Sequence, residues 1–114
     1  MLREEDRIRL RHMLDAAAEA VAYAAGRTRE DLDSDRQLVH SLVRCIEVIG
    51  EAASRVTPAV REDYPDIPWQ GVIGMRNRLI HAYFDVNLTI VWRTVKEELP
   101  EIVKAVDQAL REPE

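Results

Sequence analysis

Apolar residues recur at helical spacing along most of the chain, and this pattern constrains the fold more than any other feature. The 114 residues include only four glycines and five prolines, and no segment alternates polar and apolar residues for long enough to predict a strand. The periodicity predicts a first helix over about 3–25 that stops at Gly26. Thr28–Leu32 is expected to form a short turn.

A second long helix is predicted to begin after a cap at Asp33 or Ser34 and to end at Thr57. Pro58 is suited to open another short helical turn. Two apolar stripes run side by side along this helix, and a face this wide favours several neighbours, with a second subunit as one alternative. The stripes consist of Leu38, Leu42, Cys45, Ile49, Ala52 and Val56, and of Val39, Val43, Ile46 and Ala53.

Two further helices complete the pattern. Pro68 is predicted to start the third, and Asn87 is predicted to cap the fourth, which Pro100 should kink or split. The apolar stripe of the third helix contains Trp69, Val72, Ile73, Arg76, Leu79, Ile80 and Tyr83, so Arg76 is expected at a core position. Four main helices with short links predict an all-α fold, an up-and-down four-helix bundle with short extra helical turns, as one domain over 1–114.

Composition restricts where such a protein works. No apolar run approaches the length of a membrane-spanning helix, and the charged first residues are unlike a signal peptide. The single Cys45 allows no internal disulfide, and nothing near it has metal-ligand spacing, so neither a metal nor another cofactor is expected. A reducing cytoplasm fits these features best, with no membrane partner.

Charge is distributed unevenly along the chain. The net charge of −5 argues against broad, nonspecific nucleic-acid binding. It leaves room for a small site that holds one or two phosphates, because between positions 71 and 94 three arginines, Arg76, Arg78 and Arg93, face only one acidic residue, Asp85.

The stretch 75–84 collects groups that bind anions and transfer protons. Arg76 can hold a phosphate with paired donors, and His81 has an ordinary pKa near working pH. Asn77 lies four residues before His81 and can orient it, while Arg78 can bind a neighbouring phosphate. Together these residues suit the cleavage of RNA without a metal. For Arg76 the alternative is a stem that packs in the core while its head reaches water.

The helical wheel raises a difficulty for this site. In a regular helix Arg76 and His81 lie about 140° apart around the axis. Either the arginine reaches around, or the helix loosens near Ile80, or the substrate is held between two subunits. A dimer would also supply a second histidine, so that one group need not serve as both acid and base.

The motif and its flanks resemble the HepT-like branch of the HEPN domains. Arg76-Asn77, three residues, then His81-Ala82-Tyr83 matches the family signature R-x-x-x-x-H-x-Y. The similarity extends to flanking segments over most of the chain. These are Pro68-Trp69, Gly74-Met75-Arg76-Asn77-Arg78, Val91-Trp92, Glu98-Leu99-Pro100 and Ile49-Gly50-Glu51-Ala52-Ala53.

The resemblance implies a dimeric, metal-independent endoribonuclease that acts as the toxin of a toxin–antitoxin pair. It places the active pair at Arg76 and His81, and the attachment of AMP by a small nucleotidyltransferase antitoxin of the MNT type at Tyr83. The alternative is a catalytically weak HEPN module that binds its nucleotidyltransferase or a nucleotide in a regulatory role.

The other chemically capable residues receive structural interpretations. His12 and His40 are predicted to be ordinary helical residues, and Cys45 a buried small hydrophobe. Trp69 and Trp92 are expected in the bundle core rather than as platforms for stacking bases.

Overall fold

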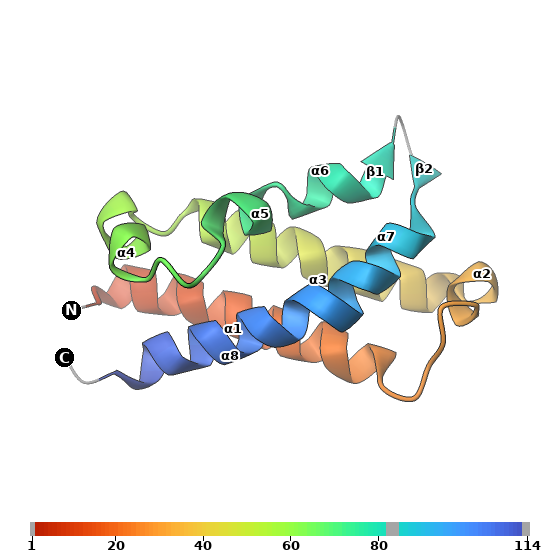
Figure 1. Ribbon diagram of the computed structural model, residues 1–114, viewed down its shortest axis with the longest axis horizontal. Helices are drawn as coiled ribbons and strands as arrows, with labels where there is room; N and C mark the ends of the chain where they lie inside the picture. Colours follow the sequence, from red (N-terminus) through yellow and green to blue (C-terminus); the bar gives the residue numbers. More distant parts are fainter. Residues whose placement is uncertain (1, 82–84, 113–114) are drawn as a thin grey trace.

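Three long helical rods form the frame of the molecule. The computed structural model describes residues 2–81 and 85–112. The first rod is α1 (Glu4–Ala24) and the second is α3 (Arg36–Ser54), while the third runs through α7 (Leu88–Arg93), the π-helical segment η1 (Thr94–Glu98) and α8 (Leu99–Arg111). α1 packs along both α3 and α8, so it lies between them in the contact network (Figure 1). The all-α prediction is confirmed.

Short elements connect and cover these rods. They are α2 (Asp31–Ser34), α4 (Pro58–Asp63), α5 (Trp69–Ile73), α6 (Met75–Leu79) and a two-stranded antiparallel ladder of β1 (Ile80–His81) and β2 (Asp85–Val86). α5 and α6 pack on α3 and take the place of a fourth bundle helix. The ladder and α2 lie at the end of the molecule opposite the first turn of α1 and the last turn of α8 (Figure 1).

The first two helices follow the predicted pattern closely. α1 ends at Ala24, and Gly26 has a φ of 74°, the left-handed conformation that suits glycine after a helix. The predicted cap of α3 at Asp33 or Ser34 is wrong, because both residues belong to α2. Asp35 is the cap instead, and its Oδ1 accepts a hydrogen bond from the Leu38 N–H at 3.0 Å. Pro58 opens α4, as predicted.

The predicted third helix is interrupted twice. The first break is at Gly74, which ends α5 and whose N–H donates to the Gln70 carbonyl at 3.0 Å. Glycine is a poor helix former, which explains the position of this break. The second is after Leu79, whose carbonyl accepts the Asn87 N–H at 2.8 Å as the chain enters the ladder. The predicted stripe position at Tyr83 lies outside the described residues.

These breaks change which side chains face the core. Val72, Met75 and Leu79 are buried, whereas Arg76 is exposed. The prediction of Arg76 at a core position is therefore wrong, because the stripe was drawn through a helix that does not continue past Gly74.

The last rod confirms both predictions made for it. Asn87 caps α7, since its Oδ1 accepts the Ile90 N–H at 3.0 Å. Pro100 lies in the first turn of α8, directly after the π-helical turn of η1. Proline has no N–H to donate and its ring crowds the preceding turn, so the wider π turn accommodates it within one continuous rod.

Two contacts position the segments that lead into the motif. Asp6 is buried and accepts hydrogen bonds from both the N–H and the hydroxyl of Thr57, each at 2.9 Å, which ties α1 to the start of α4. Gly50 on α3 lies against α5, where a Cβ would meet the Val72 carbonyl oxygen at 3.4 Å. α5, and α6 after it, therefore pack directly on α3.

Candidate functional site

α6 presents the polar residues of the motif on the surface. Met75 and Leu79 are buried and lie one turn apart, so they anchor this short helix to the core. The three residues between them that carry polar side chains, Arg76, Asn77 and Arg78, are all exposed. The outward orientation predicted for Asn77 and Arg78 is confirmed.

Arg76 points toward α3. Its Nε donates to Glu47 Oε2 at 2.9 Å, with 53% of the arginine side chain and 33% of the glutamate side chain exposed. Within the described part of the chain, no other hydrogen bond engages the guanidinium. One edge of the guanidinium is therefore fixed by Glu47, while the terminal nitrogens remain able to bind an anion.

Arg78 points toward the third rod instead. Its Nη2 donates to Glu98 Oε1 at 3.0 Å and its Nη1 lies 3.4 Å from the second carboxylate oxygen. A longer contact of 3.4 Å joins Nη2 to the Gly71 carbonyl. The two arginines therefore diverge, one toward α3 and the other toward η1.

His81 lies in β1, where its backbone pairs with that of Asp85. The helix ends immediately before Ile80, so of the three alternatives it is the loosening of the helix near Ile80 that is observed. The angle of about 140° between Arg76 and His81 therefore does not apply, because His81 is in extended backbone. The side chain of His81 and the whole of Tyr83 lie outside the described residues, and their roles stay predictions.

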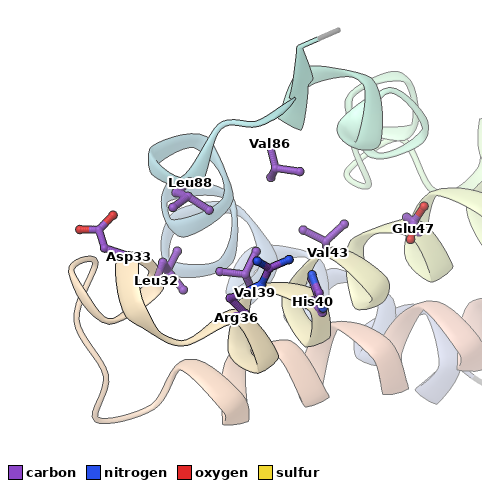
Figure 2. A pocket seen from close by; sticks show the side chains of 9 residues that line it. All are labelled: Leu32, Asp33, Arg36, Val39, His40, Val43, Glu47, Val86 and Leu88. Atoms are coloured by element: carbon purple, nitrogen blue, oxygen red, sulfur yellow. The ribbon is translucent and has the colours of Figure 1, made fainter. Parts of the chain in front are cut away.

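A groove of about 630 Å³ opens beside the motif, between α2, α3, β2 and the start of α7 (Figure 2). Its walls combine aliphatic residues with four charged or titratable ones. The lining consists of Leu32, Asp33, Arg36, Val39, His40, Val43, Glu47, Val86 and Leu88. Glu47 belongs both to this groove and to the ion pair with Arg76, so the groove adjoins the motif directly.

Sequence reasoning did not find this groove. His40 was interpreted as an ordinary helical residue, and Arg36 was not singled out. The available signal was the spacing of positions 36, 40, 43 and 47, which places them along one face of α3. That spacing reveals a shared face but not the strand that closes the groove from above.

The structural interpretations of the other residues are confirmed where the structure tests them. Cys45 is buried, and burial raises the pKa of its thiol. Trp69 is buried and its Nε1–H lies 3.1 Å from both the Arg61 and the Tyr64 carbonyl oxygens. Trp92 packs against the core while partly exposed. Of the helices in residues 2–81 and 85–112, none has the length and apolar character needed to cross a membrane.

Comparison with known proteins places these features in a family. The profile of the family described as Ribonuclease HepT-like matches residues 13–109. The chain belongs to this family. No solved structure matches it significantly.

Several relatives of this HepT-like chain carry names that describe ribonucleases. A protein of Caldanaerobacter subterraneus subsp. tengcongensis, named as a candidate RNase, is 37% identical over 90% of this chain and 91% of its own length. A candidate RNase of Methanocaldococcus jannaschii is 41% identical over 75% of this chain and 70% of its own length. A protein of Thermococcus cleftensis named "probable ribonuclease HepT" is 37% identical over 78% of this chain and 84% of its own length.

Proposed function

We propose that this HepT-like chain is a metal-independent endoribonuclease whose active pair is Arg76 and His81. Family membership and the names of the relatives support ribonuclease activity. The observation that carries the assignment to this site is the state of Arg76. An exposed guanidinium, held on one edge by Glu47 and open on the other, is prepared to bind a phosphate next to a histidine of the same motif.

RNA supplies its own nucleophile for this reaction. His81 removes the proton of a 2′-hydroxyl, and the oxygen attacks the adjacent phosphorus. Arg76 stabilises the extra negative charge of the pentacoordinate transition state. The bond from phosphorus to the 5′-oxygen then breaks, and the leaving oxygen takes up a proton. The products are a 2′,3′-cyclic phosphate and a free 5′-hydroxyl.

Asn77 and Arg78 have supporting roles in this proposal. Asn77 orients His81 or binds the substrate from the exposed face of α6. Arg78 binds a phosphate that lies further along the RNA, for which it has to exchange its contact with Glu98. Since that ion pair is partly exposed, its exchange for a phosphate costs little.

The active form is proposed to be a homodimer. One motif supplies one histidine, whereas the reaction needs a base and then an acid. Two motifs across one cleft provide both groups without a proton having to return to the same imidazole. A monomeric variant that keeps full nuclease activity would contradict this part of the proposal.

Control of the activity is proposed to act through Tyr83. A cytoplasmic MNT-type nucleotidyltransferase antitoxin transfers AMP to the phenol of Tyr83 and silences the toxin, as in a type VII-like toxin–antitoxin system. The attached AMP adds bulk and negative charge where an RNA phosphate has to bind. Tyr83→Phe should keep nuclease activity and escape the antitoxin, and a Tyr83→Phe protein that is still silenced by AMP transfer would refute the assignment.

The decisive experiment is cleavage of RNA by purified wild type and His81→Ala in the presence of a chelator. We expect the wild type to cut and to leave cyclic phosphate ends, and the variant to lose at least two orders of magnitude in rate. Equal rates for the two proteins would favour the binding module that regulates its nucleotidyltransferase. Cleavage that stops on chelation would refute metal independence.

A separate measurement tests the partner. The intact mass of the protein is determined after co-expression with an MNT-type nucleotidyltransferase. We expect an added multiple of AMP that maps to Tyr83, and an unmodified chain would contradict the proposed control.

A further inference from the structure

The groove between α2, α3, β2 and α7 is continuous with the proposed active site on two sides. On α3, Glu47 lines the groove and binds Arg76. On the ladder, Val86 lines the groove and pairs through its backbone with Ile80, the residue before His81. Figure 2 shows Val86 above the groove and Glu47 at the far end of its floor. A molecule held at Arg76 can therefore extend into this groove.

The size and the apolar walls of the groove suit one nucleotide unit. Its volume of about 630 Å³ lies in the range of ordinary small-molecule sites. Five aliphatic side chains from four elements form the walls and can contact the faces of a base. They are Leu32, Val39, Val43, Val86 and Leu88.

The charges in the groove favour an anion. Its two carboxylates are already neutralised, because Asp33 pairs with Arg29 at 3.0 Å and Glu47 pairs with Arg76 at 2.9 Å. Arg36 and His40 are exposed and, among the described residues, no carboxylate pairs with either of them. They lie one turn apart on α3, so their side chains share a face. The groove therefore offers two adjacent donors to a phosphate.

The distance along α3 shows that this phosphate is not the one held by Arg76. Seven residues separate His40 from Glu47, which is roughly 10 Å of helix, and Arg36 is one further turn away. We infer that the groove is a subsite for a neighbouring nucleotide of single-stranded RNA, with its base against the aliphatic walls and its phosphate on Arg36 and His40. This inference rests on the proposed function.

Three glutamine variants test the subsite, and the two arginine variants among them remove the same charge. Arg36→Gln and His40→Gln remove the proposed donors, and Arg44→Gln is the control, because Arg44 is also an exposed arginine of α3 but lies outside the groove. All three are made in the inactive His81→Ala background, and binding of a labelled single-stranded RNA of about ten nucleotides is measured by fluorescence anisotropy at several salt concentrations.

We expect Arg36→Gln to weaken RNA binding about tenfold, and His40→Gln to weaken it less. Arg44→Gln should lose only the affinity that the removal of any one positive charge costs. The slope of log K against log salt should fall by about 0.7 for each phosphate contact removed. Equal affinities and slopes for Arg36→Gln and Arg44→Gln would overturn the inference.

Substrate length separates the subsite from the active pair. In the enzyme that keeps His81, Arg36→Gln should raise KM for the longer RNA and leave cleavage of a dinucleotide unchanged, because the single phosphate of a dinucleotide is held at Arg76 and none is left for Arg36. Val43→Phe, which narrows the groove without a change of charge, should likewise raise KM for the longer RNA. An equal loss on both substrates would overturn the inference.

The remaining outcomes distinguish the inference from the proposed function. If wild type neither cuts nor binds RNA, the proposed function fails. If wild type cuts RNA and these variants match Arg44→Gln, only the subsite fails. Sedimentation velocity is also run on each variant. If Arg36→Gln makes the dimer dissociate, and the fraction that stays dimeric binds RNA normally, the groove is a contact with a second copy of the chain. That result would overturn the inference.

Discussion

Replacement of Arg76 by alanine should separate activity from stability. If Arg76 binds the scissile phosphate, Arg76→Ala loses most of the nuclease activity while the fold stays intact. If Arg76 is instead an arginine whose stem packs in the bundle, the same change mainly destabilises the protein. The structure gives a magnitude for each effect, and the two differ enough to be told apart.

The expected loss of stability is small because the ion pair is open to solvent. Arg76 keeps 53% of its side chain exposed and Glu47 keeps 33%. Pairs with this exposure contribute about 0.2–1 kcal/mol. Alanine is slightly favoured over arginine in a helix, which offsets part of that loss. The free energy of unfolding should therefore fall by no more than about 1 kcal/mol, measured by urea denaturation at a fixed protein concentration.

The expected loss of activity is much larger. Removal of one preorganised donor to a developing oxyanion costs about 10²–10³-fold in rate, or about 2.7–4 kcal/mol. The assay is single-turnover cleavage of a labelled RNA, with enzyme in excess so that product release does not limit the rate.

Arg55→Ala is the matched control for both measurements. Arg55 Nε donates to Glu51 at 3.0 Å, and 57% of its side chain is exposed, so the bond and its exposure resemble those of Arg76. Arg55 follows the last residue of α3 and is not part of the motif. A stability loss above about 2 kcal/mol for Arg76→Ala, or cleavage rates equal to those of Arg55→Ala, would refute the assignment of Arg76.

Three predictions concern other parts of the molecule. Asp6→Ala leaves the two donors of Thr57 without their acceptor and should lower the free energy of unfolding by about 1–3 kcal/mol in urea titrations, whereas Thr57→Ser should cost less. The Arg27 guanidinium, together with the Leu38 N–H, lowers the pKa of Asp35. The ionised Asp35 carboxylate therefore stabilises the fold at pH values above the ordinary carboxyl range, and this stabilisation is lost as the pH falls through the lowered pKa. Circular dichroism from pH 6 to about pH 2 should therefore show a weaker acid dependence for Asp35→Asn. Burial raises the pKa of the Cys45 thiol. Alkylation of Cys45 should therefore be slower than that of a free thiol at the same pH, and it should accelerate only above the pH at which ordinary thiols ionise. A rate equal to that of free cysteine would contradict the burial of Cys45.

Features governed by neighbouring residues in the sequence were predictable. The end of α1 before Gly26 and the cap at Asn87 depend on local backbone preferences, and each is observed. The expected disturbance of the helix by Pro100 takes the form of a π-helical turn just before it. The cap at Asp35 was missed because three adjacent polar residues compete for this role. In the structure the first two of these residues belong to α2, which leaves Asp35 as the cap of α3.

Features that depend on contacts between distant segments were not predictable. A strand of two residues is too short to show alternation, so the ladder of β1 and β2 left no signal in the sequence. The break at Gly74 occurs where α5 and α6 each settle on α3, and the stripe drawn through it placed Arg76 in the core. The groove combines 32–47 with 86–88, segments that meet only in the folded chain.

The same tertiary arrangement bears on how an acidic chain would bind RNA under the proposed function. A net charge of −5 repels a polyanion from most of the surface. Along this face of α3, however, Arg76 neutralises Glu47 and Arg29 neutralises Asp33, and in the part of the chain that the structure describes no carboxylate pairs with Arg36 or His40. Arg36 therefore keeps an unbalanced positive charge beside the groove. If the proposed subsite binds RNA, it gains little from long duplexes and most from a flexible single strand that can turn into the groove, and we then expect cleavage to favour exposed single-stranded segments.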